Sequence, residues 1–460
     1  MPFVPHSEAD VEHMLATIGV DNIDDLFDEI PQHLANGRLD DVPAGVSELG
    51  MMQRMQARAA LDDGFTCFLG AGSYDHHIPA AVWDITSRGE FMTAYTPYQA
   101  EASQGTLQLI YEFQSMMATL TGMDVSNASV YDGASGLGEA VLMAVRANKK
   151  NKSNTVAIAD SVHPNYSQAT NNIVKNQGIE IVSLPVDGAM GTAQTIELET
   201  PPAAVVIQQP NFFGALEAVD HLTDWAHSQG SLVVAVVNPM SLAVLKSPRD
   251  WGENGADIVC GDGQPFGVPM ASGGPSFGFV CARQALVRQM PGRIIGRTED
   301  LDGKVGYALT LQAREQHIRR GKATSNICTN QGLLVTAGTI YLSLLGPQGL
   351  FEVATKSHAN ANQLKQGLLE IDGIELTWPS PTFHEFVVSL PVKVAQLLPL
   401  MQQQKILAGL DLADFVGHII PQADNKMLVA VTEKRTEQEI QAFLVAIKAC
   451  LGQLQSGASA

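Results

Sequence analysis

The stretch AAVVIQQPNFFGALEAVDHLTDWAHSQGSLVVAVVNP, residues 203–239, predicts the fold class of this chain. Its two ends, residues 203–210 and 231–239, are almost continuously apolar, which is typical of strands buried on both faces of a sheet. The segment between them, residues 217–230, has the character of a helix. A strand, a helix and a second strand in this order predict an α/β domain with a mainly parallel sheet.

The same pattern continues on both sides of this stretch. Four more short apolar runs predict further buried strands, at residues 154–160, 179–186, 256–262 and 276–282. A long apolar helix is expected over residues 330–346 and ends at Gly346. The alternation of strands and helices therefore extends over most of the chain.

Changes in composition and in the apolar pattern divide the sequence into four parts. We expect a helical N-terminal arm, a large α/β domain, a smaller C-terminal α+β domain and a frayed tail, over residues 1–62, 63–345, 346–455 and 456–460. In the arm, Ser7 and Asp10 have the spacing of a capped helix start, and Gly19 ends that helix.

The composition limits the classes of partner. Lys+Arg 28 against Asp+Glu 48 gives a net charge of −20, which argues against a nucleic acid or an anionic membrane as partner. The 5 cysteines are scattered without a C-x-x-C pair, so the sequence indicates neither a zinc site nor a disulfide framework. The first residues lack the pattern of a signal peptide, and no apolar run approaches the length of a membrane span. We expect a bacterial cytoplasmic protein.

Ligands of an open α/β sheet bind outside the carboxyl ends of its strands, so the loops there are the candidate site. One such loop begins the helix in VYDGASGLGEAVLMAVR, residues 130–146, where the N–H groups of Gly133, Ala134 and Ser135 could hold a phosphate. A tight turn of small residues explains this loop equally well. His163 follows another strand, where it could stack on a planar cofactor ring or be an ordinary loop residue.

Two further segments concentrate polar side chains. TAYTPYQAEASQGTLQ, residues 93–108, holds six candidate site residues: Tyr95, Tyr98, Gln99, Glu101, Ser103 and Gln104. QAREQHIRRGKATSNICTNQ, residues 312–331, holds three arginines that are candidates for an anion or carboxylate clamp: Arg314, Arg319 and Arg320. The alternatives are a solvated loop in the first segment and a charge-balanced helix face in the second.

A last segment, ADIVCGDGQPFGVPMASGGPSFGFVC, residues 256–281, joins two strands through a Gly-rich turn. Enzymes that use pyridoxal phosphate often carry their Schiff-base lysine in such a turn. This segment contains no lysine, and Gln264 lies in the turn.

These segments, in this order, resemble the glycine decarboxylase P-protein, the pyridoxal-phosphate component of the glycine cleavage system. TPYQAEASQGTLQ, TLQAREQHIRRGKATSNICTNQ and GDGQPFGVPMASGGP are the specific matches, and the resemblance covers nearly the whole chain. It implies the pyridoxal-phosphate-dependent transferase fold of type I. It also implies subunit 1, the N-terminal half, of the split form of the enzyme, with two copies of each subunit.

The resemblance implies a reaction and its partners. The family decarboxylates glycine on pyridoxal phosphate, releases CO2 and passes the aminomethyl group to the lipoyl arm of H-protein. H-proteins are generally acidic, so the net charge of this chain opposes their encounter. The basic cluster of residues 314–322 or the partner subunit could supply a local positive rim.

The chain departs from the family pattern at two positions. By spacing, Gln264 lies where the lysine would be, and Asn238 lies where an aspartate would hold the pyridine nitrogen protonated. We therefore predict that a lysine-bearing partner subunit binds the cofactor and that this chain, with residues 95–104, completes its active site. A vestigial pocket would remain here: Gly133, Ala134, Ser135, His163, Asn238 and Gln264.

Two alternatives stay open. The chain could be a stabilising or regulatory subunit that places no residue in the active site. It could also be an independent pyridoxal-phosphate lyase that uses Lys246 or Lys322, although neither lysine lies in a turn after a strand.

Overall fold

The computed structural model describes residues 6–31, 33–34, 41–98, 104–189, 191–193, 196, 198–271, 274–417, 419–420 and 422–457. The chain divides into two compact units, Met1–Gly64 and Phe65–Ala460. The division of the second unit at residue 345 stays a prediction.

The first unit consists of short helices. They are α1 (Glu8–Ile18), the 3₁₀ helix η1 (Ile23–Phe27) and α2 (Glu48–Ala59). Ser7 caps α1 together with Asp10, and Gly19 ends it at φ 90°, so both ends of this helix are as predicted. None of the residues in these three helices is buried within the structure.

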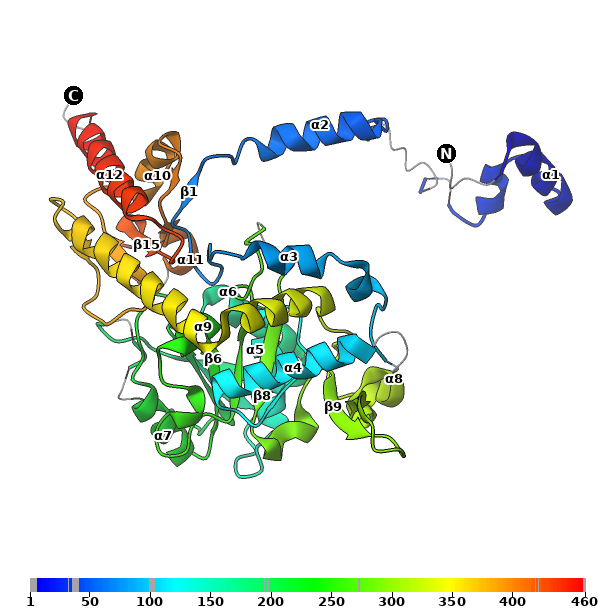
Figure 1. The fold of residues 1–460 in the computed structure, drawn as a ribbon, viewed down its shortest axis with the longest axis horizontal. Helices are drawn as coiled ribbons and strands as arrows, with labels where there is room; N and C mark the ends of the chain where they lie inside the picture. The colour runs from blue at the N-terminus through cyan, green and yellow to red at the C-terminus, as the bar shows by residue number, and fades with distance from the viewer. Residues whose placement is uncertain are drawn as a thin grey trace. The chain divides into compact units, whose positions relative to one another are not determined.

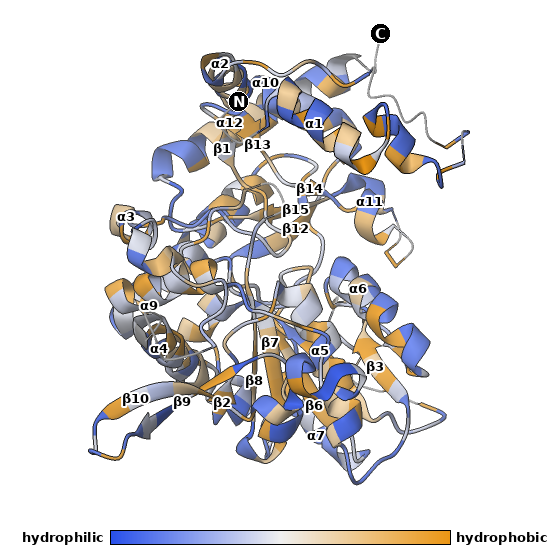
Figure 2. Cartoon of the chain, turned by 90° about the vertical axis from the view of Figure 1, so that its right-hand side faces the viewer, coloured by the Kyte–Doolittle hydropathy of each residue, from blue (hydrophilic) through white to orange (hydrophobic). Residues whose placement is uncertain are grey.

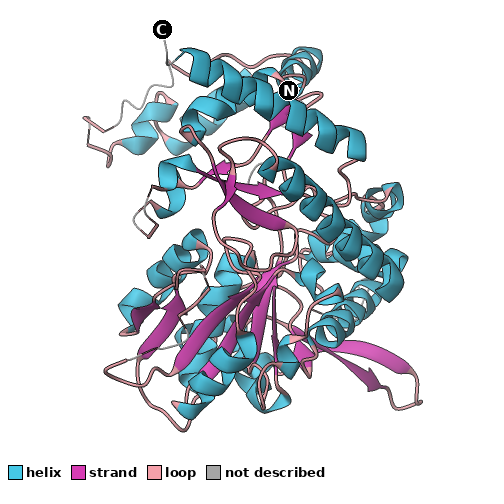
Figure 3. Ribbon diagram, turned by 90° about the vertical axis from the view of Figure 1, so that its left-hand side faces the viewer, coloured by secondary structure: helices cyan, strands magenta, loops and turns pink. Residues whose placement is uncertain are grey.

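A seven-stranded sheet forms the centre of the second unit (Figure 3). Its order is β2 (Val125–Ser126), β8 (Gly278–Ala282), β7 (Ile258–Asp262), β6 (Leu232–Val237), β5 (Ala204–Gln209), β3 (Thr155–Ala159) and β4 (Glu180–Leu184). The five strands from β7 to β4 are parallel, and β8 and β2 add antiparallel pairs at one edge. All six strands predicted from apolar runs are confirmed, together with the mainly parallel sheet.

The apolar runs are explained by burial on both faces of this sheet. Every residue of β8 is buried, as are nearly all residues of β5, β6 and β7, and Figure 2 shows these strands as predominantly hydrophobic. The helix α5 (Gly133–Ala147) contacts β6, β7 and β8, while α7 (Val219–Ser228) contacts β5 and β6. The helix α6 (Pro164–Val174) packs beside α5.

Two long helices, α4 (Gln104–Thr121) and α9 (Gly332–Leu369), lie side by side (Figure 1). At Gly346 the backbone of α9 is non-helical, with φ 58° and ψ −173°, so the predicted break is present, and Pro347 follows it. Contrary to the sequence-based expectation, α9 is by length and composition apolar enough to cross a membrane, the one such helix found among the described residues. Half of its apolar window is buried inside the protein, as expected of a core helix.

A smaller sheet with its own core follows. Its order is β11 (Glu375–Leu376), β12 (Glu385–Ser389), β15 (Lys426–Ala430) and β14 (Leu410–Asp411), and α10 (Val394–Gln403) and α12 (Glu437–Gly457) pack beside it. The strand β1 (Thr66–Cys67) pairs with β13 (Ile406–Leu407), which ties the start of the second unit to this C-terminal region.

The remaining elements are short. They are α3 (Ala80–Thr86), η2 (Gly89–Met92), η3 (Lys175–Gln177), η4 (Pro239–Ala243), η5 (Pro248–Asp250), η6 (Gln284–Gln289), η7 (Gln312–Arg314), α8 (Gln316–Arg319), η8 (Arg320–Lys322), α11 (Ala413–Val416) and η9 (Ala423–Asn425). A hairpin of β9 (Ile294–Glu299) and β10 (Val305–Thr310) was not anticipated from the sequence.

Candidate functional site

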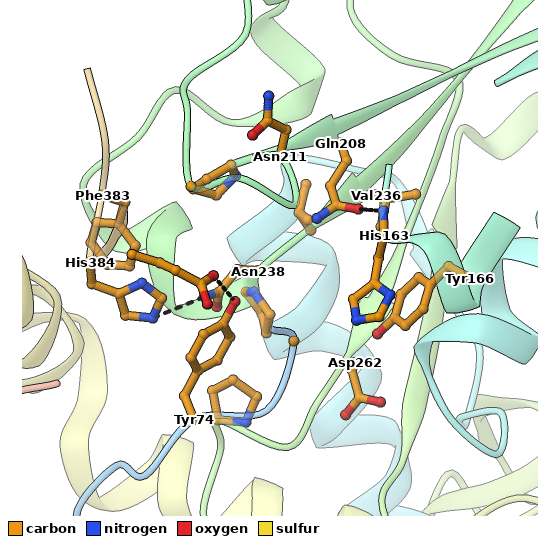
Figure 4. Close-up of a pocket in the computed structure, with 17 residues that line it drawn as sticks. Tyr74, His163, Tyr166, Gln208, Asn211, Val236, Asn238, Asp262, Phe383 and His384 are labelled. Carbon is orange, nitrogen blue, oxygen red and sulfur yellow. Dashed lines mark hydrogen bonds between the residues drawn. The ribbon is translucent and has the colours of Figure 1, made fainter. Parts of the chain in front are cut away.

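A small pocket lies at the carboxyl edge of the central sheet (Figure 4). Residues that follow β3, β5, β6 and β7 line it on one side, and Tyr74 and the segment 383–385 line it on the other. The free space within it amounts to about 40 Å³, which is room for a few water molecules. The pocket thus has the position of a cofactor site. Beside it, Ala134, His163 and Gln264 line a second, more open hollow of about 320 Å³.

Gln264, which the sequence places where the lysine is expected, has a buried and fully paired amide. Its side-chain oxygen accepts a hydrogen bond from the N–H of Tyr74 at 2.9 Å, and its Nε2 donates to the carbonyl of Tyr74 at 2.9 Å. Nε2 also donates to the carbonyl of Val268 at 2.8 Å. The side chain is 5% exposed, so this amide joins two loops in the interior.

The start of α5, where a phosphate would bind, is already occupied by carboxylates. Asp262 accepts from the N–H of Gly133 at 3.0 Å, and Asp132 accepts from the N–H of Ser135 at 2.7 Å as the helix cap. The hydroxyl of Tyr166 lies over Gly133, only 2.2 Å from where a Cβ would be. Burial raises the pKa of Asp262, while its hydrogen bonds act in the opposite direction. A phosphate here would meet the carboxyl groups of Asp132 and Asp262 and the hydroxyl of Tyr166, which line the hollow.

Both ring nitrogens of His163 have hydrogen-bond partners. Its Nδ1 accepts from the N–H of Asn165 at 3.2 Å, so Nε2 carries the proton and donates to the carbonyl of Ala71 at 2.9 Å. Tyr166 stacks on the imidazole ring with 4.9 Å between centroids. Burial lowers the pKa of His163, which favours this neutral form.

Asn238 also has partners for its amide. Its oxygen caps η4 by accepting from the N–H of Met240 at 3.0 Å, and its Nδ2 lies 3.3 Å from Nε2 of His384. Burial, followed by the nearby His76 and His358, places the pKa of His384 well below its usual range. A neutral histidine therefore faces the amide.

Glu385, a titratable group that lines the pocket, is not among the site residues predicted from the sequence. One oxygen accepts from the N–H of Ala71 at 2.6 Å and the other from the hydroxyl of Tyr74 at 2.9 Å. Burial raises the pKa of Glu385 to about 7. Its position inside the strand β12, among apolar neighbours, was the signal that could have identified it, because a buried carboxyl is rare without a partner.

These residues do not fit pyridoxal phosphate. The cofactor needs a lysine for its Schiff base, a carboxylate beside its ring nitrogen and free N–H groups for its phosphate. Among the described residues that line the pocket and the hollow beside it there is no lysine. The residue expected at the ring nitrogen is the amide Asn238, and the N–H groups of Gly133 and Ser135 have protein acceptors. The described chain also holds no cluster of three or more His, Cys, Asp or Glu suited to a metal ion.

The segment TAYTPYQAEASQG is described in part. Tyr95 is 84% exposed and Tyr98 is 41% exposed. Gln99, Glu101 and Ser103 lie outside the described residues, and Gln104 begins α4. The structure therefore brings Tyr95 and Tyr98 to the surface, and neither lines the small pocket or the hollow beside it that Gln264 lines.

The arginine candidates have separate surroundings. Arg314 is half-buried and donates to the backbone carbonyls of Met290 and Gly292, so its guanidinium is already engaged. Arg319 and Arg320 are exposed, and Nε of Arg319 donates to the carbonyl of Ala313 at 2.9 Å. The buried arginine nearby is Arg293, which the sequence analysis did not single out.

The two lysines of the alternative hypothesis also lie elsewhere. Lys246 forms an ion pair with Asp220 at 2.8 Å, and Lys322 is exposed at the end of η8. Neither lines the pocket at the edge of the sheet.

Comparison with known proteins places this geometry in context. The family model described as glycine cleavage system P-protein matches residues 1–447. A protein of Alcanivorax borkumensis named probable glycine dehydrogenase (decarboxylating) subunit 1 is 57% identical over 456 residues, covering 98% of this chain and 100% of the relative. A Legionella pneumophila protein of the same name is 56% identical over 452 residues, covering 97% of this chain and 98% of the relative.

Solved structures agree with this likeness. The crystal structure of a glycine decarboxylase (P-protein) of the glycine cleavage system, in inhibitor-bound form, has a TM-score of 0.85 and 39% sequence identity. The match covers 98% of this chain and 100% of that chain. A sphingosine-1-phosphate lyase of Burkholderia pseudomallei has a TM-score of 0.64 at 14% identity, with 92% of this chain and 95% of that chain covered, and shares the fold alone. The predicted transferase fold of type I is confirmed.

Proposed function

This chain belongs to the glycine cleavage system P-protein family, and on that premise we propose that it is subunit 1 of a split glycine decarboxylase. Together with a lysine-bearing subunit 2 it decarboxylates glycine, releases CO2 and passes the aminomethyl group to the lipoyl arm of H-protein. Subunit 2 binds the pyridoxal phosphate. Two copies of each subunit assemble in the bacterial cytoplasm.

The state of Gln264 is the single observation that carries this division of labour. Its side chain is an amide, whose nitrogen is not a nucleophilic amine, and it is held by the backbone of Tyr74 and Val268, so the position cannot form a Schiff base. Two more observations support the same conclusion. Carboxylates accept from the N–H groups of Gly133 and Ser135, where the cofactor's phosphate would bind. The residue expected beside its ring nitrogen, Asn238, is an amide. The pocket is thus a structural remnant within an active complex.

The contribution of this chain to the partner's site comes from the segment that begins at Tyr95. Its two tyrosines are exposed although both carry large apolar rings, which is the expected state of side chains that contact a second chain. We assign positioning and electrostatic support of the substrate to Tyr95, Tyr98, Gln99, Glu101, Ser103 and Gln104. The basic residues Arg314, Arg319 and Arg320 are proposed to lower the repulsion between two acidic proteins when H-protein approaches.

Reconstitution tests the proposal. The chain is co-purified with subunit 2, and glycine–bicarbonate exchange is measured for each subunit alone and for the complex. We expect exchange in the complex and none in this chain alone. Activity of this chain by itself, for example through Lys246 or Lys322, would refute the division of labour.

Variants separate a shared active site from a purely stabilising subunit. Tyr98→Phe and Glu101→Gln are expected to lower exchange about tenfold each while the complex still assembles, because the first removes a hydroxyl and the second a negative charge. Tyr111→Phe is the matched control, since Tyr111 packs against Tyr307 within the chain at 5.3 Å between ring centroids. Full exchange by both site variants would show that this chain has only a structural or regulatory role.

A further inference from the structure

The buried side chain of Arg293 ends at a surface tyrosine. Arg293 is 2% exposed and lies at the end of the turn before β9. One of its Nη atoms donates to the hydroxyl of Tyr98, and its guanidinium carbon lies 4.6 Å from the centre of the Tyr98 ring. Glu315 lies 3.6 Å from its Nε and balances its charge. Burying an arginine is unfavourable without such partners. The contacts with Tyr98 and Glu315 therefore stabilise the buried position of Arg293.

The turn that carries Arg293 is held rigidly. Gly292 has φ 73°, a left-handed conformation that glycine adopts without strain, and a Cβ there would lie 3.2 Å from the carbonyl oxygen of Ser129. Three hydrogen bonds fix the backbone carbonyls of this turn: Ala128 N–H to Arg293, Asn127 Nδ2 to Pro291 and Arg314 Nη2 to Gly292. The guanidinium therefore projects from a fixed base.

Two further contacts join Tyr98 and the residues just before it to the segment that follows β10. The ring of His317 meets the Tyr98 ring edge-on with 5.6 Å between centroids. Two residues before Tyr98, the hydroxyl of Thr96 lies 2.6 Å from the hydroxyl of Thr329. The two polar segments that stood out in the sequence are thus joined to each other, with Arg293 at the junction.

The chemistry of the pair fixes the role of the hydroxyl. Arginine can only donate hydrogen bonds, so Tyr98 accepts from it. A phenol that accepts in this way keeps its own proton to donate, and among the described residues no group accepts a hydrogen bond from the Tyr98 hydroxyl. Accepting a charge-assisted hydrogen bond also strengthens the hydroxyl as a donor.

We propose that Arg293 is a positioning residue of the shared active site: it orients the Tyr98 hydroxyl as a hydrogen-bond donor toward the partner subunit's substrate. The proposal rests on the proposed function, because it requires Tyr98 to reach that site. Arg293 itself acts through Tyr98 and touches no substrate.

Hydrogen–deuterium exchange of the full-length chain tests the anchoring without any cofactor. In Arg293→Gln we expect the amides of residues 93–98 to exchange about tenfold faster, because the segment loses a hydrogen bond to a charged group. Arg435→Gln is the matched control, since Arg435 is also buried and paired with a carboxylate, at 3.0 Å from Asp75. Because Glu315 would be left unbalanced, Arg293→Gln/Glu315→Gln serves as a second variant that removes both charges. Unchanged exchange of residues 93–98 in both Arg293 variants would overturn the inference.

A double-mutant cycle in the reconstituted complex tests the role in the reaction. Arg293→Gln and Tyr98→Phe are each expected to lower kcat about tenfold with little change in the KM for glycine. The double variant should be no slower than Tyr98→Phe alone, since Arg293 acts through that hydroxyl. Additive losses of kcat would refute the inference and leave the shared site intact. Full activity of Tyr98→Phe would instead refute the shared site, and the inference with it.

Discussion

Replacing Gln264 by lysine restores the residue type that a Schiff base needs while leaving the surrounding pocket unchanged. If a missing lysine were the only obstacle, Gln264→Lys would bind pyridoxal phosphate. We expect it to remain without cofactor, because the carboxyl groups of Asp132 and Asp262 already accept from the N–H groups of Gly133 and Ser135 and would repel a phosphate there. The variant should also be less stable than the wild type.

The loss of stability follows from the contacts of the amide. Lysine has no acceptor for the buried N–H of Tyr74, and leaving one such donor unsatisfied costs about 1–3 kcal/mol. The ammonium group can still donate to the carbonyls of Tyr74 and Val268, but it loses its hydration at a position that is 5% exposed. Together these effects predict a loss of about 2–4 kcal/mol. For a unit of this size that corresponds to a fall in Tm of roughly 2–4 °C.

Two measurements check the prediction. Thermal unfolding compares Gln264→Lys with the wild type and with Gln264→Met, which removes the same hydrogen bonds without adding a charge. Absorbance in the visible range after incubation with pyridoxal phosphate, followed by borohydride reduction and mass spectrometry, detects a Schiff base. Gln284→Lys, which adds a lysine at an exposed position, controls for unspecific labelling.

One result would refute the reasoning. If Gln264→Lys gains a borohydride-trapped cofactor well above the Gln284→Lys control and keeps the wild-type Tm, the pocket is open to the cofactor. The carboxylates and Tyr166 would then not be a barrier, and the loss of the lysine alone would explain the division between the two subunits.

Two more predictions concern the contact between the central sheet and the smaller sheet. The pKa of Glu385 is raised to about 7, so between about pH 4.5 and 7 the folded chain holds a proton that the unfolded chain has released, and stability falls by up to about 3 kcal/mol as the pH rises through this window. Glu385→Gln should flatten this fall in denaturant unfolding at pH 5 and 7.5; an unchanged pH slope would contradict the assignment. Gly214→Ala should lower the free energy of unfolding by about 2–4 kcal/mol, because at φ 80° its Cβ would lie 2.0 Å from the backbone oxygen of Glu385. Gly303→Ala, at φ 75° with no atom within 4 Å of the Cβ, isolates the backbone strain, and equal losses in both variants would contradict the steric argument.

Local patterns in the sequence were sufficient for the architecture. Continuous apolar runs gave the six strands because a strand buried on both faces excludes polar side chains. The capped start of α1 at Ser7 and the break at Gly346 were equally visible, since each depends on residues a few positions apart. The absence of a lysine at Gln264 was likewise a local fact.

The partners of the site residues were decided by the tertiary structure alone. Gln264 pairs with Tyr74 across 190 positions of sequence, and Arg293 meets Tyr98 across 195. Such contacts depend on the order of strands in the sheet and on how the loops at its edge dock, which periodicity does not encode. The sequence by itself therefore determined the strands of the central sheet and the absence of a lysine from the turn at Gln264. The fold determined the partners of Gln264, Asn238 and Arg293, because buried polar groups are stable only where the folded chain gives each of them a partner.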